Sequence, residues 1–229
     1  MEVAFDNGNM SGIAVIADGT DKKETVIILH GFGGQASTIK NQLPMYNYYS
    51  DVNYIYFTAP LRNGVRYWEM ATNNDANEIM ATILELAQLY PIDINKLKLI
   101  GHSNGGLKSH KIIKLFKNSI KGAIILCAGK PDDIAPDYDK CIISFFGGSD
   151  TTINIDGGTT NSGMTYNSAD ATGKAYLAGG AQIVNEVYWN SPHNLTITDP
   201  ATQTTSLAVE MASYGIDMVK YFADKLKNM

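Results

Sequence analysis

The stretch KLKLIGHSNGGLKSHKIIKLF, residues 96–116, decides the fold. Residues 96–101 form a run of the length expected for a buried strand, and residues 105–116 carry apolar side chains at helical spacing. The segment between them, Gly101–Gly106 (GHSNGG), matches the pattern G-x-S-x-G, which places a serine on a strained turn between a strand and a helix. A chance match is the alternative in a chain with 21 glycines, but the strand–turn–helix context argues against it. We therefore predict that Ser103 is a nucleophile raised above the carboxyl-terminal edge of a sheet.

The rest of the chain alternates between strand patterns and helix patterns. This alternation predicts a three-layer α/β/α sandwich with a mostly parallel sheet, as a single domain over residues 1–229 without a cap domain. The part before Thr25 looks too short for a full pair of leading strands, and the Thr-, Gly- and Asn-rich stretch 151–168 is typical of an irregular excursion. The expected strands are 25–29, 53–58, 96–101, 120–128, 140–146 and 182–189, and the expected helices are 75–90, 105–116 and one long terminal helix over 206–226.

Composition and charge exclude several classes of function. The formal net charge of −5 and the pI near 5.3 argue against a nucleic-acid-binding protein, which would show a basic face. The apolar runs are too short to cross a bilayer, so we expect a soluble protein. Residues 1–20 show no basic segment followed by an apolar one, although a chain already trimmed of its signal peptide would look the same. The compartment and the oligomeric state stay open.

The two cysteines, Cys127 and Cys141, do not form a disulfide framework. The strand pattern places them at opposite ends of two neighbouring strands, roughly 20 Å apart at ~3.3 Å per residue, which is too far for a disulfide bond. We expect two free, buried thiols. No Cys/His cluster has the spacing of a zinc site, so we expect neither a metal nor an organic cofactor.

A second glycine-rich segment, His30–Gly34 (HGFGG), directly follows the first expected strand of the sheet. Acyl transfer places negative charge on the carbonyl oxygen of the substrate, and backbone N–H groups aimed at that oxygen stabilise it. We predict the N–H groups of Phe32 and Asn104 as these donors. An ordinary glycine turn is the alternative. A nucleotide site is disfavoured because the segment lacks both the G-x-G-x-x-G spacing and a following Gly-Lys-Ser/Thr.

Elimination among the four histidines selects a candidate base. His30 belongs to the glycine-rich segment, the side chain of His102 should point away from that of Ser103, and His110 lies about two turns along the helix, roughly 10 Å away. His193 remains, in a loop just after the last expected strand, where it can reach a nucleophile above the same sheet edge. A solvent-exposed loop histidine is the alternative.

A carboxylate is needed to orient such a base and to stabilise its protonated form. Asp150 follows a strand through Gly147–Ser149 and so lies at the same carboxyl-terminal edge, whereas Asp156, in the loop just beyond, is a rival. A solvated turn aspartate is the alternative for each. Four further aspartates precede that strand and should lie at its opposite end: Asp132, Asp133, Asp137 and Asp139.

Taken together, these motifs resemble those of the α/β-hydrolase superfamily. The order Ser103, Asp150, His193 is similar to the superfamily's order of nucleophile, acid and base, HGFGG resembles its oxyanion loop, and GGSD at 147–150 resembles the turn that carries the acid in small esterases. GHSNGG and the capless layout look closest to dienelactone-hydrolase-like carboxylesterases and to feruloyl-esterase and polyhydroxybutyrate-depolymerase-like esterases. The resemblance implies hydrolysis of carboxylic esters, with short acyl groups or linked to a carbohydrate or polymer, through an acyl-enzyme.

Two other functions fit the same motifs. A thioesterase or a peptidase would use the same three side chains, because preference for a leaving group depends on the shape of the pocket. A catalytically inactive member that serves as a binding module is the third possibility. In the relatives, an aromatic residue after the second strand often lines the substrate pocket, and Tyr67 and Trp68 hold that place here. Trp68 is equally compatible with a core position, and Trp189, near His193, has the same two interpretations.

Overall fold

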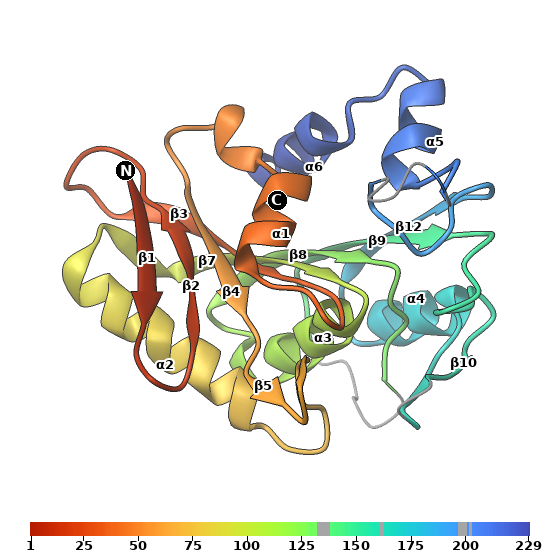
Figure 1. The fold of residues 1–229 in the computed structure, drawn as a ribbon, viewed down its shortest axis with the longest axis horizontal. Helices are drawn as coiled ribbons and strands as arrows, with labels where there is room; N and C mark the ends of the chain where they lie inside the picture. Colours follow the sequence, from red (N-terminus) through yellow and green to blue (C-terminus); the bar gives the residue numbers. More distant parts are fainter. Residues whose placement is uncertain (132–137, 161–162, 197–200, 202) are drawn as a thin grey trace.

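The computed structural model describes residues 1–131, 138–160, 163–196, 201 and 203–229, and it is built around one mixed sheet (Figure 1). The strand order is β1-β2-β4-β3-β7-β8-β9-β12. The strands from β4 to β12 pair in parallel, and β2 pairs antiparallel to both β1 and β4. The strands are β1 Glu2–Asp6, β2 Ser11–Val15, β3 Lys23–Leu29, β4 Asn53–Thr58, β7 Ile92–His102, β8 Ile120–Leu126, β9 Cys141–Gly147 and β12 Gln182–Tyr188.

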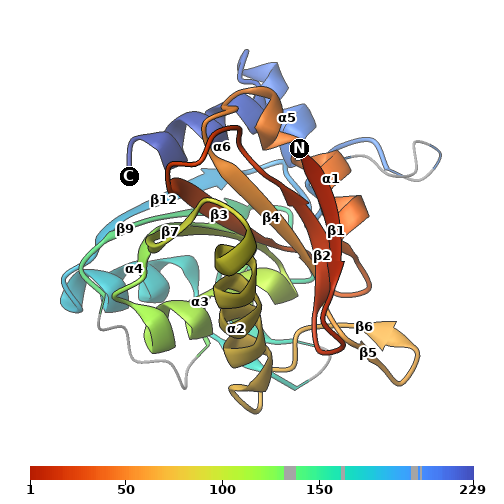
Figure 2. The same cartoon turned by 90° about the vertical axis from the view of Figure 1, so that its left-hand side faces the viewer.

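Helices cover both faces of this sheet, which confirms the predicted three-layer sandwich (Figure 2). On one face lie α2 Asn74–Leu89, α3 Asn104–Phe116 and α4 Ala169–Ala178. On the other face lie α1 Ala36–Gln42, α5 Leu207–Ser213 and α6 Met218–Lys227. The described residues form no separate cap domain. No helix among them combines the length and the apolar character needed to cross a membrane. The short elements are a 3-10 turn, Met45–Asn47, and two hairpins, β5 Leu61–Arg62 with β6 Val65–Arg66 and β10 Gly158–Thr159 with β11 Thr165–Tyr166.

The central strands are apolar on both faces because each face is covered by helices. In β3, Ile27 and Leu29 join the cluster under α2 and α3, whereas Val26 and Ile28 join the cluster under α1 and α6. All four side chains are buried. This alternation explains why strands such as TVIIL read as continuous apolar runs in the sequence, and it makes the sheet a rigid support for the loops at its edges.

The expectation that the residues before Thr25 are too few for two leading strands is wrong. β1 and β2 are only five residues each and are joined by a turn at Gly8, so fifteen residues suffice for the pair. β2 pairs with β4, and β1 forms the edge of the sheet on that side. Short edge strands with alternating exposure carry too little apolar character to stand out in the sequence.

The prediction of one long terminal helix is also wrong. Gly215, with φ of 75°, follows the end of α5, and the N–H of Ile216 donates to the carbonyl oxygen of Met211. Asp217 then begins α6, since its carboxylate accepts from the N–H of Lys220. The apolar stripe of 206–226 continues through this break and conceals it.

The cysteines are free as predicted, but only one of them is fully buried. Cys127 is buried just after β8, whereas Cys141, at the start of β9, is half-buried. The stretch 151–168 contains the β10–β11 hairpin, with Tyr166 packed into the core, so its described part is more ordered than an irregular loop.

The close approach of α3 to β3 yields a stability prediction. A Cβ on Gly105 would fall on the carbonyl oxygens of Leu29 and His30, which are backbone atoms that cannot move aside. We expect Gly105→Ala to lower the free energy of unfolding by about 3 kcal/mol or more, measured by chemical denaturation. Gly8→Ala is the control: the turn has open space, and its φ of 87° costs about 1 kcal/mol. An equal decrease in the free energy of unfolding for the two variants would contradict this packing.

Candidate active site

Ser103 lies on a backbone turn that ordinary residues avoid. Its φ of 53° and ψ of −119° fall outside the allowed regions for a residue with a Cβ. Two hydrogen bonds hold it there: its N–H donates to the carbonyl oxygen of Leu126, and its own carbonyl accepts from the N–H of Leu107. The turn joins the end of β7 to the first residue of α3, as the sequence predicts, and it presents the hydroxyl at the carboxyl-terminal edge of the sheet.

The structure brings together the three side chains proposed as nucleophile, base and acid, although they are far apart in the chain. The Oγ of Ser103 lies 2.7 Å from Nε2 of His193, and Nδ1 of the same ring lies 2.7 Å from Oδ2 of Asp150. A carboxylate can only accept, so Nδ1–H donates to Asp150 and Nε2 is left to accept the serine hydroxyl. The result is one continuous relay from carboxylate to imidazole to hydroxyl.

Asp150 is held by backbone donors as well as by the ring. Its Oδ1 accepts from the N–H groups of Thr152 (2.8 Å) and Ile153 (2.9 Å), and its side chain is fully buried. The rival Asp156 is exposed, and His193 is already paired with Asp150. Asp139 is exposed and pairs with Lys140 at the opposite end of β9. The other three sequence candidates, Asp132, Asp133 and Asp137, lie outside the described residues.

Two backbone N–H groups that the sequence singles out, those of Phe32 and Asn104, lie in the loop after β3 and at the start of α3. In the described part of the chain, neither Phe32 nor Asn104 donates its N–H to another protein group. Asn104 is the first residue of α3, where a helix leaves its N–H groups without an internal partner. Gly31 brings the other loop close, because a Cβ there would lie only 3.1 Å from Nδ1 of His102 and 3.2 Å from Cβ of Ser103.

Trp68 connects the two segments that carry these N–H groups. Its indole N–H donates to the carbonyl oxygen of His30 (2.8 Å). Its backbone N–H and carbonyl are both bonded by the side-chain amide of Asn104, at 2.6 and 3.1 Å. The ring is fully buried, as expected for a core position, and contact of Trp68 with a substrate stays a prediction.

Of the other two aromatic candidates, Tyr67 is half-buried and Trp189 is exposed. The ring of Tyr67 stacks on that of Phe32, with centroids 5.8 Å apart, and the Arg62 guanidinium lies 5.6 Å from the Tyr67 ring. Trp189 is exposed at the end of β12, and its carbonyl accepts from the hydroxyl of Ser149. Contact of Tyr67 or Trp189 with a substrate stays a prediction.

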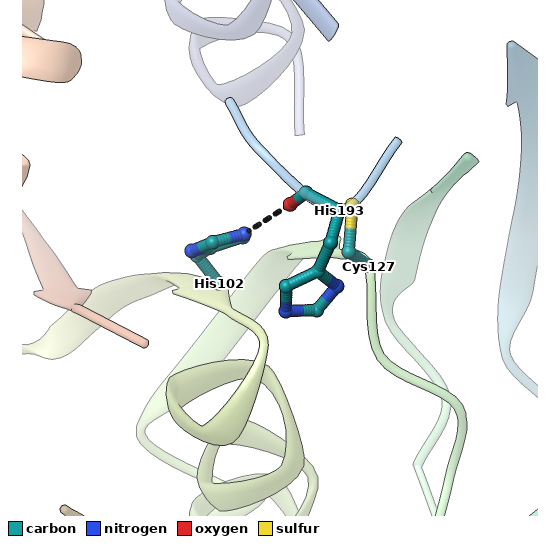
Figure 3. Close-up of side chains that lie close together, drawn as sticks. All are labelled: His102, Cys127 and His193. Carbon is teal, nitrogen blue, oxygen red and sulfur yellow. Dashed lines mark hydrogen bonds between the residues drawn. The ribbon is translucent and has the colours of Figure 1, made fainter. Parts of the chain in front are cut away.

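The sequence does not reveal the contact made by His102, which lies between Gly101 and Ser103 in the turn. Its Nε2 donates to the backbone carbonyl oxygen of His193 at 2.9 Å, and the two rings lie 5.2 Å apart (Figure 3). The turn at Ser103 is thus tied to the loop that carries His193. The sequence shows only that His102 points away from Ser103, and it cannot show which loop it meets.

Cys127 lies beside the same two histidines, and the three could in principle hold a metal ion (Figure 3). Their ligand atoms lie within 4.8 Å of one another. However, both nitrogens of His193 and Nε2 of His102 already make hydrogen bonds, so an ion would have to break the relay. Burial also raises the pKa of the Cys127 thiol, which opposes formation of the thiolate that a metal requires. The cluster therefore fits a hydrogen-bonded site better than a metal centre.

Three histidines around the site, the buried His30 and His110 and the half-buried His102, are held neutral. Burial lowers the pKa of His30 to about 4 and the pKa values of His102 and His110 to about 3. Each ring has a partner suited to the neutral form: His30 Nε2 accepts from the N–H of Ala59 (3.0 Å), and His110 Nδ1 lies 2.7 Å from the Tyr176 hydroxyl. These rings add no positive charge beside His193 at neutral pH.

The parallel sheet, the helices on both faces and the serine on the β7–α3 turn together define the α/β-hydrolase fold. The solved structures agree. A carboxylesterase from Bacillus cereus superimposes with a TM-score of 0.66 at 20% identity, over 96% of this chain and 96% of that chain. A carboxylesterase from Mesorhizobium loti has a TM-score of 0.66 at 16% identity, over 97% and 98%. Acyl-protein thioesterase 2 from Zea mays has a TM-score of 0.57 at 16% identity, over 93% and 97%.

At these identities the likeness concerns the fold. No protein-family model matches the sequence, and no curated protein matches it. The function must therefore be argued from the site.

The neutral histidines predict how stability depends on pH. In the unfolded chain they take up protons near their ordinary pKa of about 6.5, whereas in the folded chain they stay neutral down to about pH 4. Their stabilising contribution is therefore complete above that ordinary pKa and is lost as the pH falls. We expect His110→Gln to reduce the slope of unfolding free energy against pH by about 1.4 kcal/mol per pH unit between about pH 6 and pH 4. Denaturant titrations at several pH values measure this slope, and an unchanged slope would contradict a neutral His110.

Proposed function

We propose that this chain is a serine hydrolase that cleaves carboxylic esters through an acyl-enzyme. The observation that carries the proposal is the relay of two 2.7 Å hydrogen bonds from Asp150 through His193 to Ser103. A hydroxyl is a weak nucleophile on its own, and a base within hydrogen-bonding distance activates it. The likeness of the fold to two carboxylesterases supports the same chemistry.

In the acylation step, Oγ of Ser103 attacks the ester carbonyl carbon while its proton moves to Nε2 of His193. The carbonyl oxygen becomes an oxyanion that accepts from the N–H groups of Phe32 and Asn104, which act as the oxyanion hole. The protonated ring donates from Nδ1 to the carboxylate of Asp150, which stabilises its positive charge. Nε2 then gives its proton to the alkoxide oxygen as the bond to the acyl carbon breaks.

In the deacylation step, a water molecule takes the place of the alcohol. Nε2 of His193 accepts a proton from that water as its oxygen attacks the acyl carbon, and the same proton returns to Oγ of Ser103 when the acyl–enzyme bond breaks. The products are a carboxylic acid and an alcohol. These two steps need no group beyond the side chains and N–H groups already described.

A thioester is the second candidate substrate, because it undergoes the same acyl transfer. The likeness of the fold to acyl-protein thioesterase 2 from Zea mays favours it over an amide. Hydrolysis rates for a p-nitrophenyl ester and an acyl-coenzyme A with the same acyl group distinguish the two candidates.

The proposed roles predict a clear pattern of activity. We expect the wild-type chain to be labelled by a fluorophosphonate and to hydrolyse p-nitrophenyl butyrate, and Ser103→Ala to do neither. Asp150→Asn should lower kcat by a factor of about 10⁴, because the ring loses its orientation and its countercharge. Asp156→Asn is the matched control and should keep wild-type activity. If the wild-type chain is not labelled and hydrolyses no activated ester, the proposal is wrong. If Asp156→Asn loses activity and Asp150→Asn does not, Asp156 and not Asp150 is the acid.

The hydrogen bond from His102 to the carbonyl of His193 predicts that two substitutions of His102 lower kcat to different extents. Gln extends an amide N–H to the place of Nε2, whereas the Asn amide ends about where Nδ1 lies and cannot reach the carbonyl of His193. We expect His102→Gln to keep kcat within a few-fold, and His102→Asn to lower kcat about tenfold with little change in KM, since one buried acceptor loses its partner at about 1–3 kcal/mol. Steady-state kinetics decide the case, and equal kcat in both variants would contradict a positioning role for His102.

A further inference from the structure

Two largely apolar cavities adjoin at the start of α3, and the first of them is lined by Ser103. The first, of about 330 Å³, is lined by Ser103 itself and by Leu107 and Ile153. The second, of about 470 Å³, continues past Leu107 to Met70 and Met164. The two share Leu107, Phe32 and Asn104 as lining residues. Together they form one apolar space that begins at the nucleophile and runs along the first turn of α3.

The proposed chemistry determines which part of a substrate enters this space. The tetrahedral carbon carries four groups: Oγ of Ser103, the oxyanion, the leaving oxygen and the acyl chain. The oxyanion points to the N–H groups of Phe32 and Asn104. The leaving oxygen must face Nε2 of His193, which gives it a proton. His193 lines neither cavity, so the acyl chain is the group left to occupy them.

The charges around the space select the kind of acyl chain. Among the described residues, the one carboxylate that lines it is Glu69, in the second cavity, which accepts hydrogen bonds from the N–H groups of Ala71 and Thr72. Lys108, beneath, is fully buried and bonded to the backbone carbonyl of Glu69, so its ammonium does not reach the cavity. An acyl chain that ends in a carboxylate would meet a like charge, and no lysine or arginine is among the described lining residues. An uncharged hydrocarbon chain would meet Leu107, Ile153 and the methionines.

We propose that this site selects esters and thioesters of an uncharged, unbranched acyl chain of roughly six to ten carbons, with little selection on the alcohol. The inference rests on the proposed function. The first cavity has volume for roughly ten non-hydrogen atoms at about 30 Å³ each, the volume of a water molecule in the liquid, and these include the reacting ester group, so the end of a longer chain passes Leu107 into the second cavity. The side toward His193 and the exposed Trp189 belongs to neither cavity, so a large alcohol or a polymer-linked one has room to leave.

A series of p-nitrophenyl esters tests the acyl assignment. Each methylene that enters the cavity should raise kcat/KM about fourfold, because burial contributes about 0.8 kcal/mol and a tenfold change corresponds to about 1.4 kcal/mol. We expect kcat/KM to rise from acetate through butyrate to hexanoate. Adipate monoester, which has six carbons and a terminal carboxylate, should react at least tenfold more slowly than hexanoate. A series in which acetate is fastest would overturn the assignment.

Variants of Leu107 test where the chain lies. Leu107→Trp fills the junction of the cavities, so kcat/KM for hexanoate should fall at least tenfold more than kcat/KM for acetate. Leu115→Trp is the matched control, because it is the same substitution on an exposed position of the same helix, and it should keep the wild-type preference. Met164→Trp, at a half-buried position in the second cavity, should lower kcat/KM for decanoate more than kcat/KM for hexanoate. This variant replaces the Leu107 variant in the test if the latter does not fold. Unchanged preference in either folded cavity variant would overturn the inference.

Two further measurements separate this inference from the proposed function. Hexanoyl esters of p-nitrophenol and of the larger 4-methylumbelliferone should have kcat/KM values within a few-fold of each other after correction for leaving-group pKa. Strong selection on the alcohol and none on the acyl chain would show that the cavities hold the alcohol. Fluorophosphonate labelling of Ser103 reports on the catalytic machinery alone: labelling without acyl selection refutes only this inference, whereas no labelling and no turnover refutes the proposed function.

Discussion

The site depends on one backbone constraint, the strained turn at Ser103. Its positive φ is maintained because β7 and α3 are each locked into a core that cannot relax around it, with Gly105 packed directly on the carbonyl oxygens at the end of β3. In a parallel sheet the carboxyl ends of neighbouring strands meet at one edge. The loops after β3, β9 and β12 therefore bring Phe32, Asp150 and His193 to the same serine. One strained residue and one parallel sheet together account for the convergence of side chains that are far apart in the sequence.

Hydrogen bonds between loops then fix the geometry that the sheet alone leaves free. Trp68 joins the loop after β3 to Asn104, and His102 joins the turn at Ser103 to the carbonyl of His193. Burial holds His30 and His102 neutral, with pKa values of about 4 and 3, so these supports do not place a positive charge next to the proposed base. The proposed mechanism gains from this arrangement, because the only new charges during acylation are on the imidazole ring and the oxyanion, and each faces a group aimed at it.

Most of the fold could be predicted from the sequence, because the parallel strands are continuous apolar runs and G-x-S-x-G requires a strand before it and a helix after it. The side chains of Ser103, His193 and Asp150 could be chosen because topology puts the ends of parallel strands at one edge. The contacts of His102 and the two hydrogen bonds between Asn104 and Trp68 could not be predicted, since they depend on which loops pack together. The break at Gly215 and the helices α1 and α4 were missed for a related reason: α1 and α4 are short, and tertiary packing stabilises them more than their own apolar pattern does.

The central claim is that the turn at residue 103 presents its oxygen to the imidazole and, at the same time, presents a bound acyl group to two backbone donors. A crystal structure of the chain after reaction with a hexyl phosphonate tests it most directly. The account predicts phosphorus bonded to Oγ of Ser103, one phosphonyl oxygen within about 3 Å of the N–H groups of Phe32 and Asn104, and the hexyl chain over Leu107. A phosphonate attached to another residue, or its oxygen directed away from both N–H groups, would contradict the account.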